Sequence, residues 1–167
     1  MGGTGWRPLD RSELEALERL ARERLRGAAQ PTKRNVFISF AAEDMNEVNL
    51  LRAQAKNENS DLEFNDWSLK EPFESSKAEY IMRGIRERIR QSSVTLCYLS
   101  ENTAKSRWVD WEMRESVKLG KAVIGVHKGD RPPRNMPKAV KELGIEVIPW
   151  RTAEITKAID KAARQRE

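Results

Sequence analysis

The segment SRWVDWEM, residues 106–113, combines two tryptophans and a glutamate at helical spacing. Trp108 and Glu112 are four residues apart, so on a helix they lie one above the other. An indole beside a carboxylate shields it from water, which can raise the pKa of the carboxyl group. A flat aromatic ring suits a nucleobase or a nicotinamide ring, and a carboxylate can hold ribose hydroxyls or stabilise an oxocarbenium-like centre. The pattern indicates a nucleotide site; the alternative is a tryptophan packed between helix and sheet, with Glu112 in a surface ion pair.

Other residues of suitable chemistry stand at the ends of short apolar runs. They are acidic, hydroxylic or aromatic: Phe40, Asp44, Asp66, Ser68 and Ser106. Neither G-x-x-x-x-G-K-[ST] nor G-x-G-x-x-G occurs, so the two familiar glycine-rich phosphate cradles are missing. His127 is the only histidine, which argues against a histidine metal cluster and against Ser-His-Asp catalysis. We expect no metal ion and no resident cofactor.

The elements that would position these residues alternate between two periods. Strands are expected at 35–40, 62–67, 94–100, 121–129 and 145–150, and helices at about 44–56, 77–92 and 107–120, shortly after 137, and at 152–165. Strict alternation predicts an α/β fold with a five-stranded parallel sheet and helices on both faces. The strand lengths favour the flavodoxin-like order 2-1-3-4-5, with the apolar run 94–100 as a central strand.

This architecture predicts where a ligand would bind. In open α/β sheets, ligands lie beyond the carboxyl ends of the strands at the switch point, here between strands 1 and 3. The loop after strand 3 leads directly into the helix of Trp108 and Glu112. In that helix we expect Val109, Met113 and Val117 to face the sheet, and Gly120 to end it.

The chain is expected to divide into an N-terminal helix with a linker, residues 1–34, and a main domain, residues 35–167. Apolar residues recur at spacings of three and four, namely Leu14, Leu17, Leu20, Ala21 and Leu25, and Gly27 is expected to stop the helix. Two capping boxes are equally good at its start, Asp10 with Glu13 and Ser12 with Glu15. We interpret this helix as one that packs on the domain or on a partner protomer.

Charge and composition limit the partners. The net charge of +5 is concentrated in residues 1–34, which hold eight Lys/Arg against five Asp/Glu, so the main domain is nearly balanced. No basic run is interleaved with aromatics, and we expect no nucleic-acid partner. No apolar run approaches bilayer length and the start lacks a secretory pattern, so we expect no membrane contact and a cytoplasmic location. Cys97 is the only cysteine and is expected to be a buried thiol.

From Asn35 to about Trp150, the sequence resembles the TIR-like domains of bacterial Thoeris antiphage defence, of the ThsB type. The resemblance rests on VFISF followed by Asp44, on FNDWSL with Asp66 at its strand end, on SSVTLCYLSENTAKSRW, and on the W-x-x-x-E of Trp108 and Glu112. One departure is the loop after strand 2, which lacks the glycine-rich character of many TIR loops.

The resemblance implies a function. TIR domains with this glutamate cleave NAD at the nicotinamide–ribose bond, and Thoeris-type members cyclise the product into an ADP-ribose signal that activates a partner effector protein. By this resemblance Glu112 is the catalytic carboxylate, NAD is the substrate, and the pocket is lined as follows: Phe40, Asp44, Asp66, Ser68 and Trp108. The resemblance also implies self-association through TIR-like contacts. Two alternatives remain: a non-catalytic TIR-like module that signals by assembly, and a sensor that binds a nucleotide without turning it over.

Overall fold

The computed structural model describes residues 7–29, 34–58, 62–65 and 73–165, with the backbone alone for 24–29. The chain divides into two compact units, Met1–Thr32 and Lys33–Glu167. Two of the predicted site residues, Asp66 and Ser68, lie outside the described residues.

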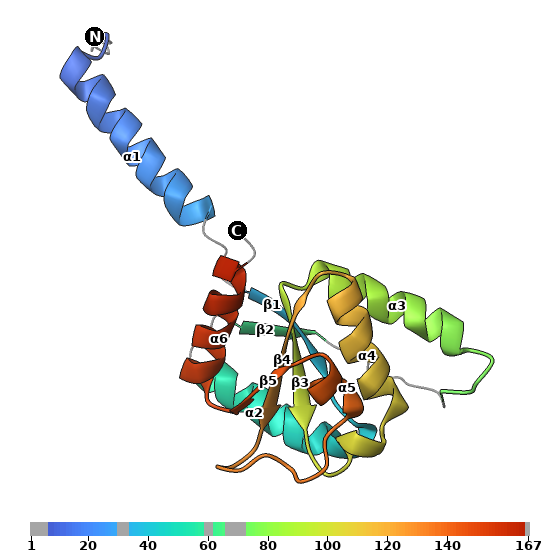
Figure 1. Cartoon of the computed structure of the whole chain (residues 1–167). Coiled ribbons are helices and arrows are strands. Elements are labelled where there is room, and N and C mark those ends of the chain that lie inside the picture. The colour runs from blue at the N-terminus through green and yellow to red at the C-terminus, as the bar shows by residue number, and fades with distance from the viewer. Residues whose placement is uncertain (1–6, 30–33, 59–61, 66–72, 166–167) are drawn as a thin grey trace. The chain divides into compact units, whose positions relative to one another are not determined.

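The second unit is built on a five-stranded parallel sheet in the order β2-β1-β3-β4-β5, which confirms the predicted fold (Figure 1). Its strands are β1 (Arg34–Ser39), β2 (Leu62–Asn65), β3 (Val94–Leu99), β4 (Ala122–His127) and β5 (Glu146–Pro149). Val94 of β3 pairs with Val36 of β1 on one side and with Ala122 of β4 on the other. Every residue of β3 is buried, as expected of a central strand covered on both faces.

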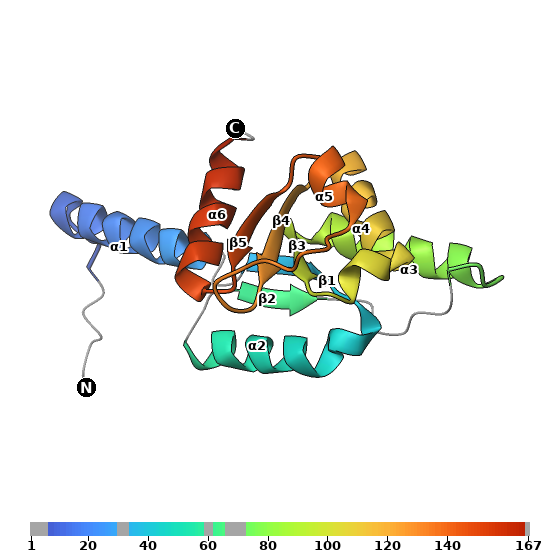
Figure 2. The same cartoon turned by 60° about the horizontal axis from the view of Figure 1, so that its bottom comes forward.

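Helices cover both faces of this sheet. They are α2 (Met45–Asn57), α3 (Ala78–Gln91), α4 (Arg107–Lys118), α5 (Lys138–Glu142) and α6 (Thr152–Gln165), with short 3₁₀ turns η1 (Ala42–Asp44) and η2 (Thr103–Lys105). Figures 1 and 2 show α2 and α6 on one side of the strands, and α3, α4 and α5 on the other.

The period-two alternation of the strands divides the core between these two layers. On β1, Val36 and Ile38 belong to the cluster that includes Val48 of α2 and Ile155 of α6. Phe37, which points the other way, packs in the cluster that contains the isoleucine stripe of α3. Burial of such a side chain contributes about 1.5–3 kcal/mol, so both helical layers are held on the sheet by apolar contact.

The buried face of α4 differs from the prediction at one position. Val109 and Met113 are fully buried, but Val117 is 43% exposed, so the expectation that it faces the sheet is wrong. At 100° per residue, position 116 returns to within about 20° of position 109, whereas position 117 is about 80° away. Ser116 therefore faces the sheet, where its hydroxyl lies 2.9 Å from that of Thr95. The helix ends as expected before Gly120, whose φ of 76° permits the reversal.

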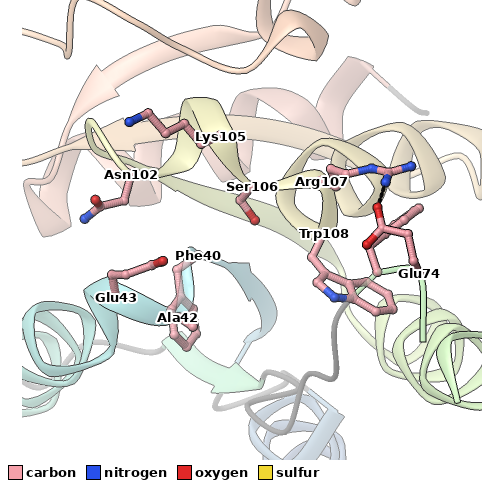
Figure 3. A pocket seen from close by; sticks show the side chains of 10 residues that line it. Phe40, Ala42, Glu43, Glu74, Asn102, Lys105, Ser106, Arg107 and Trp108 are labelled. Carbon is pink, nitrogen blue, oxygen red and sulfur yellow. Dashed lines mark ion pairs between the residues drawn. The ribbon is translucent and has the colours of Figure 1, made fainter.

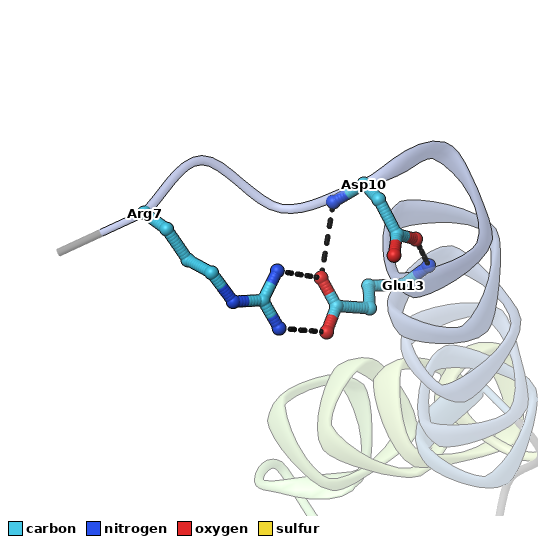
Figure 4. A network of polar contacts seen from close by, with 3 residues as sticks. All are labelled: Arg7, Asp10 and Glu13. Atoms are coloured by element: carbon cyan, nitrogen blue, oxygen red, sulfur yellow. Dashed lines mark hydrogen bonds and ion pairs between the residues drawn. The ribbon is translucent and has the colours of Figure 1, made fainter. Parts of the chain in front are cut away.

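The first unit contains α1 (Arg11–Ala29), which begins with a capping box. The Asp10 carboxylate accepts a hydrogen bond from the Glu13 amide at 2.8 Å, and the Glu13 carboxylate accepts one from the Asp10 amide at 3.0 Å (Figure 4). The Arg7 guanidinium, and to a lesser degree the Asp10 amide, lower the pKa of Glu13. The prediction that Gly27 ends this helix is wrong, because α1 continues to Ala29. Glycine inside a helix costs only about 1 kcal/mol relative to alanine and need not stop it.

Candidate functional site

A pocket of about 430 Å³, the first pocket, opens where β1 and β3 end, at the predicted crevice (Figure 3). Its lining side chains come from four segments that meet at this switch point: Phe40, Ala42 and Glu43 after β1, Phe73 and Glu74 before α3, Asn102, Lys105 and Ser106 after β3, and Arg107 and Trp108 at the start of α4. Its volume is typical of small-molecule sites. Three of the predicted site residues, Phe40, Ser106 and Trp108, are therefore brought together at one cavity.

Ser106 has a structural role as well as a place in the pocket wall. It is the N-cap of α4, and its hydroxyl accepts a hydrogen bond from the Val109 amide at 3.2 Å. A serine hydroxyl satisfies one of the helix's otherwise unpaired amides and so stabilises its first turn. The cap therefore sets the position of Trp108 at the pocket.

Asp44 lies beside the pocket but does not line it. Its carboxylate is 4% exposed and accepts two hydrogen bonds, from the Ser100 hydroxyl at 2.5 Å and from the Asn102 side-chain amide at 2.8 Å. Hydrogen bonds to an ionised group are stronger than those between neutral groups. Asp44 thus ties the segment after β1 to the segment after β3, the two segments that carry opposite walls of the pocket.

Trp108 is the centre of an aromatic cluster at the start of α4. Its ring makes edge-to-face contacts with Phe73, at 5.0 Å between centroids, and with Trp111, at 5.9 Å. The Arg107 guanidinium lies 4.5 Å from the centroid of Phe73 and forms an ion pair with Glu74. Such contacts add to apolar burial, and together they fix the segment before α3 against the first turn of α4.

Glu112 is in the protein core. Its side chain is 0% exposed, which excludes the surface ion pair considered above. It is on the same buried face of α4 as Val109 and Met113, and it is not among the side chains that line the first pocket. Glu112, the candidate carboxylate, is therefore one helical turn after Trp108, whose indole lines the pocket, and does not itself line the cavity.

Sequence reasoning did not find several of the lining residues. Glu43 and Asn102 were within loops expected at the crevice, but nothing in their type distinguished them from solvated loop residues. Phe73 and Glu74 lie in a connecting segment without periodicity, and only tertiary contact with Arg107 brings them to the site.

The described residues form neither a metal site nor a membrane-spanning helix. In the described ranges, no three His, Cys, Asp or Glu side chains come together as a metal site would require. No helix within the described part of the chain is long and apolar enough to cross a bilayer.

Several solved structures are similar to this chain at low sequence identity. The TIR domain of the Toll-related receptor TRR-2 from Hydra magnipapillata is 17% identical, with 67% of this chain and 82% of that chain covered and a TM-score of 0.44. The CMP N-glycosidase BcmB from Clostridium botulinum is 13% identical, with 76% and 99% covered and a TM-score of 0.47. The TIR domains of the activated Roq1 resistosome are 22% identical, with 57% and 58% covered and a TM-score of 0.39. These likenesses concern the fold alone.

No curated protein matches the chain. Residues 37–132, which contain the end of β1, the strands β2 to β4 and all of the first pocket, do match a known family. That family is described as the TIR-like domain of the Thoeris protein ThsB, and it covers more than half of the chain, which therefore belongs to it.

Proposed function

We propose that this protein cleaves the nicotinamide–ribose bond of NAD, with Glu112 as the catalytic carboxylate, and closes the product into a cyclic ADP-ribose-type signal for a partner effector protein. The observation that carries the proposal is a completely buried glutamate, one turn from an indole that lines a pocket at the sheet's switch point. Membership of the Thoeris family supports the same reaction.

The energetics of burial favour a functional reason for this glutamate. Removing an ionised carboxylate from water costs several kcal/mol, and even a paired buried charge is often no better than an apolar side chain of equal volume. On the same buried face of α4, Val109 and Met113 are apolar and Ser116 is a small polar residue, and Glu112 is the one wholly buried acidic side chain among the described residues of this helix. A wholly buried acid at this position is costly for stability, which supports a functional reason for it.

The chemistry needs one carboxylate. NAD binds in the first pocket with its nicotinamide near Trp108, and Glu112 holds the ribose hydroxyls and stabilises the oxocarbenium-like transition state by its negative charge. The nicotinamide is cationic in NAD and leaves as a neutral ring when the glycosidic bond breaks, so no general acid is required. Attack by water on the ribosyl carbon gives ADP-ribose, whereas attack by an adenine nitrogen of the same molecule gives a cyclic isomer.

The reaction also requires that Glu112 reach the pocket. It is fully buried and does not line the cavity, whereas Trp108, one turn before it, does. A shift of the Trp108 indole is therefore part of the proposal. Assembly or an activator would supply the free energy for this shift, as members of the TIR class often need assembly to complete the site.

The test is NAD turnover by the wild type and Glu112→Gln, with and without extract from phage-infected cells, with products identified by mass spectrometry. We expect Glu112→Gln to lose at least about 100-fold in rate, as for loss of one transition-state-stabilising group. Glu115→Gln is the matched control, because Glu115 is on the same helix, also buried, and ion-paired to Arg86 at 2.9 Å.

Each outcome of this assay assigns a role. Loss in Glu112→Gln alone supports the proposal, and equal turnover in Glu112→Gln and wild type overturns it. Glu43→Gln is a further variant because Glu43 lines the pocket. Loss in Glu43→Gln with full activity in Glu112→Gln would move the chemistry to Glu43.

A second candidate function is a non-catalytic assembly module. Two observations favour it. Glu112 is buried away from the pocket, and four leucines are each between 47% and 52% exposed: Leu9 just before α1, and Leu14, Leu17 and Leu20 within it. An apolar stripe of this kind is typical of a helix that packs on a partner. The absence of NAD consumption in activated extract would favour this function, and tight NAD binding without product would favour a sensor.

A further inference from the structure

A second pocket, of about 360 Å³, lies beside the first and shares Phe73, Lys105, Ser106 and Arg107 with it. Its remaining wall is formed by α4 and the start of α5. The side chains there that could bind a ligand are Asp110, Trp111, Arg114 and Lys138. Its volume is within the range of small-molecule sites.

The charges of this pocket are unbalanced. Arg107, Arg114, Lys105 and Lys138 face a single lining carboxylate, that of Asp110. The two arginines are neutralised within the protein. Arg107 pairs with Glu74, and Arg114 pairs with Asp110 at 2.7 Å and with Glu142 at 2.6 Å.

The two lysines differ from the arginines. Neither Lys105 nor Lys138 forms an ion pair with any carboxylate in the described ranges. Both side chains are exposed, so their ammonium groups can turn toward a ligand. The pocket therefore offers two positive charges that no described carboxylate neutralises, and these suit an anion with at least two negative charges.

Trp111 adds a planar apolar surface to these charges. Its side chain is partly buried, and its ring lines the pocket while the Arg86 guanidinium lies 5.4 Å from its centroid. Stacking on an aromatic ring is a general mode of nucleobase binding and does not depend on the base. An indole in the same pocket as these two ammonium groups thus matches the two chemical parts of a nucleotide.

We propose that the second pocket is a nucleotide site separate from the candidate catalytic site, with the base against Trp111 and a diphosphate between Lys105 and Lys138. This inference does not depend on NAD cleavage in the first pocket. Because Lys105 lines both pockets, Lys138 is the position that tests the second one alone.

The experiment is calorimetric titration of the full-length protein with ADP and, separately, with inorganic pyrophosphate. We expect Lys138→Ala to weaken ADP binding about five- to tenfold and Lys138→Glu to weaken it more, because an attraction becomes a repulsion. The control is Lys141→Ala, an exposed lysine of the same short helix that does not line the pocket; its ADP affinity should stay within about twofold of wild type.

Pyrophosphate tests the role of the indole. It should compete with ADP but bind about tenfold more weakly, since it lacks a base to stack on Trp111. The proposal is overturned if the wild type does not bind ADP, if Lys138→Glu binds as well as wild type, or if Lys141→Ala loses as much affinity as Lys138→Ala. Equal affinity for pyrophosphate and ADP would overturn the placement of a base on Trp111.

Discussion

Replacement of Asp44 tests whether this carboxylate holds the two halves of the first pocket together. Asp44→Ala removes an acceptor that is 4% exposed and receives hydrogen bonds from Ser100 at 2.5 Å and Asn102 at 2.8 Å. Hydrogen bonds to a charged group contribute about 1.5–3 kcal/mol each. The sum overstates the loss, because the exposed Asn102 amide can bond to water in the variant. We therefore expect the free energy of unfolding to fall by about 2–4 kcal/mol.

The measurement is urea denaturation followed by tryptophan fluorescence, supported by thermal melts. For a unit of this size, 1 kcal/mol corresponds to about 4 °C, so the melting temperature should fall by about 8–16 °C. Glu43→Ala is the control, because Glu43 is the exposed carboxylate next in sequence and its loss should change stability by no more than about 0.5 kcal/mol.

A double-mutant cycle separates the energy of the Asp44–Asn102 hydrogen bond from other losses of stability caused by each substitution. If Asp44 and Asn102 act together, the double variant Asp44→Ala/Asn102→Ala should be more stable than the sum of the single losses predicts, by about 1 kcal/mol. If Asp44→Ala lowers the free energy of unfolding by less than about 1 kcal/mol, or if the coupling energy is below about 0.3 kcal/mol, Asp44 does not hold the two segments together.

Two further predictions concern pH and helix capping. Burial, together with the hydrogen bond and charge of Glu47, raises the pKa of the Tyr98 phenol above its usual value of 10. The neutral phenol is therefore favoured in the folded state, so this contribution to stability is complete below about pH 10 and is lost as the pH rises above it. Tyr98→Phe should flatten the alkaline decline in the free energy of unfolding, and an unchanged decline would contradict the argument. Asp10→Ala removes the N-cap of α1, worth about 1 kcal/mol, and should reduce hydrogen-exchange protection in the first turn of the helix about fivefold, including at the Glu13 amide. Unchanged protection there would show that the capping box does not stabilise the helix.

Much of the fold was predictable because it depends on local periodicity. The isoleucines of α3 recur every four residues and are all buried, and the apolar run of β3 is the centre of the sheet. The helix rule failed where it was extended too far. Val117 follows Val109 by eight residues, which at 100° per residue is about 80° beyond two full turns, and it therefore leaves the buried face.

The candidate site was predictable in place but not in arrangement. The switch-point rule located the crevice correctly, and Trp108 lines it. The sequence could not show whether Asp44 contacts a ligand or joins two segments of the protein by hydrogen bonds, because its partners Ser100 and Asn102 are more than fifty positions away. Its role follows from a contact that no local pattern records.

The strand order, most of the helical faces and the edge of the sheet at which a site would lie could be predicted from the amino-acid sequence, because hydrophobic periodicity and βα alternation are local properties. Only the tertiary structure decided that Glu112 is wholly buried while Trp108 lines the pocket, and that Phe73 and Glu74 meet Arg107 at the start of α4. The exposure of a side chain depends on which distant segments pack over it, and that packing is a property of the whole fold.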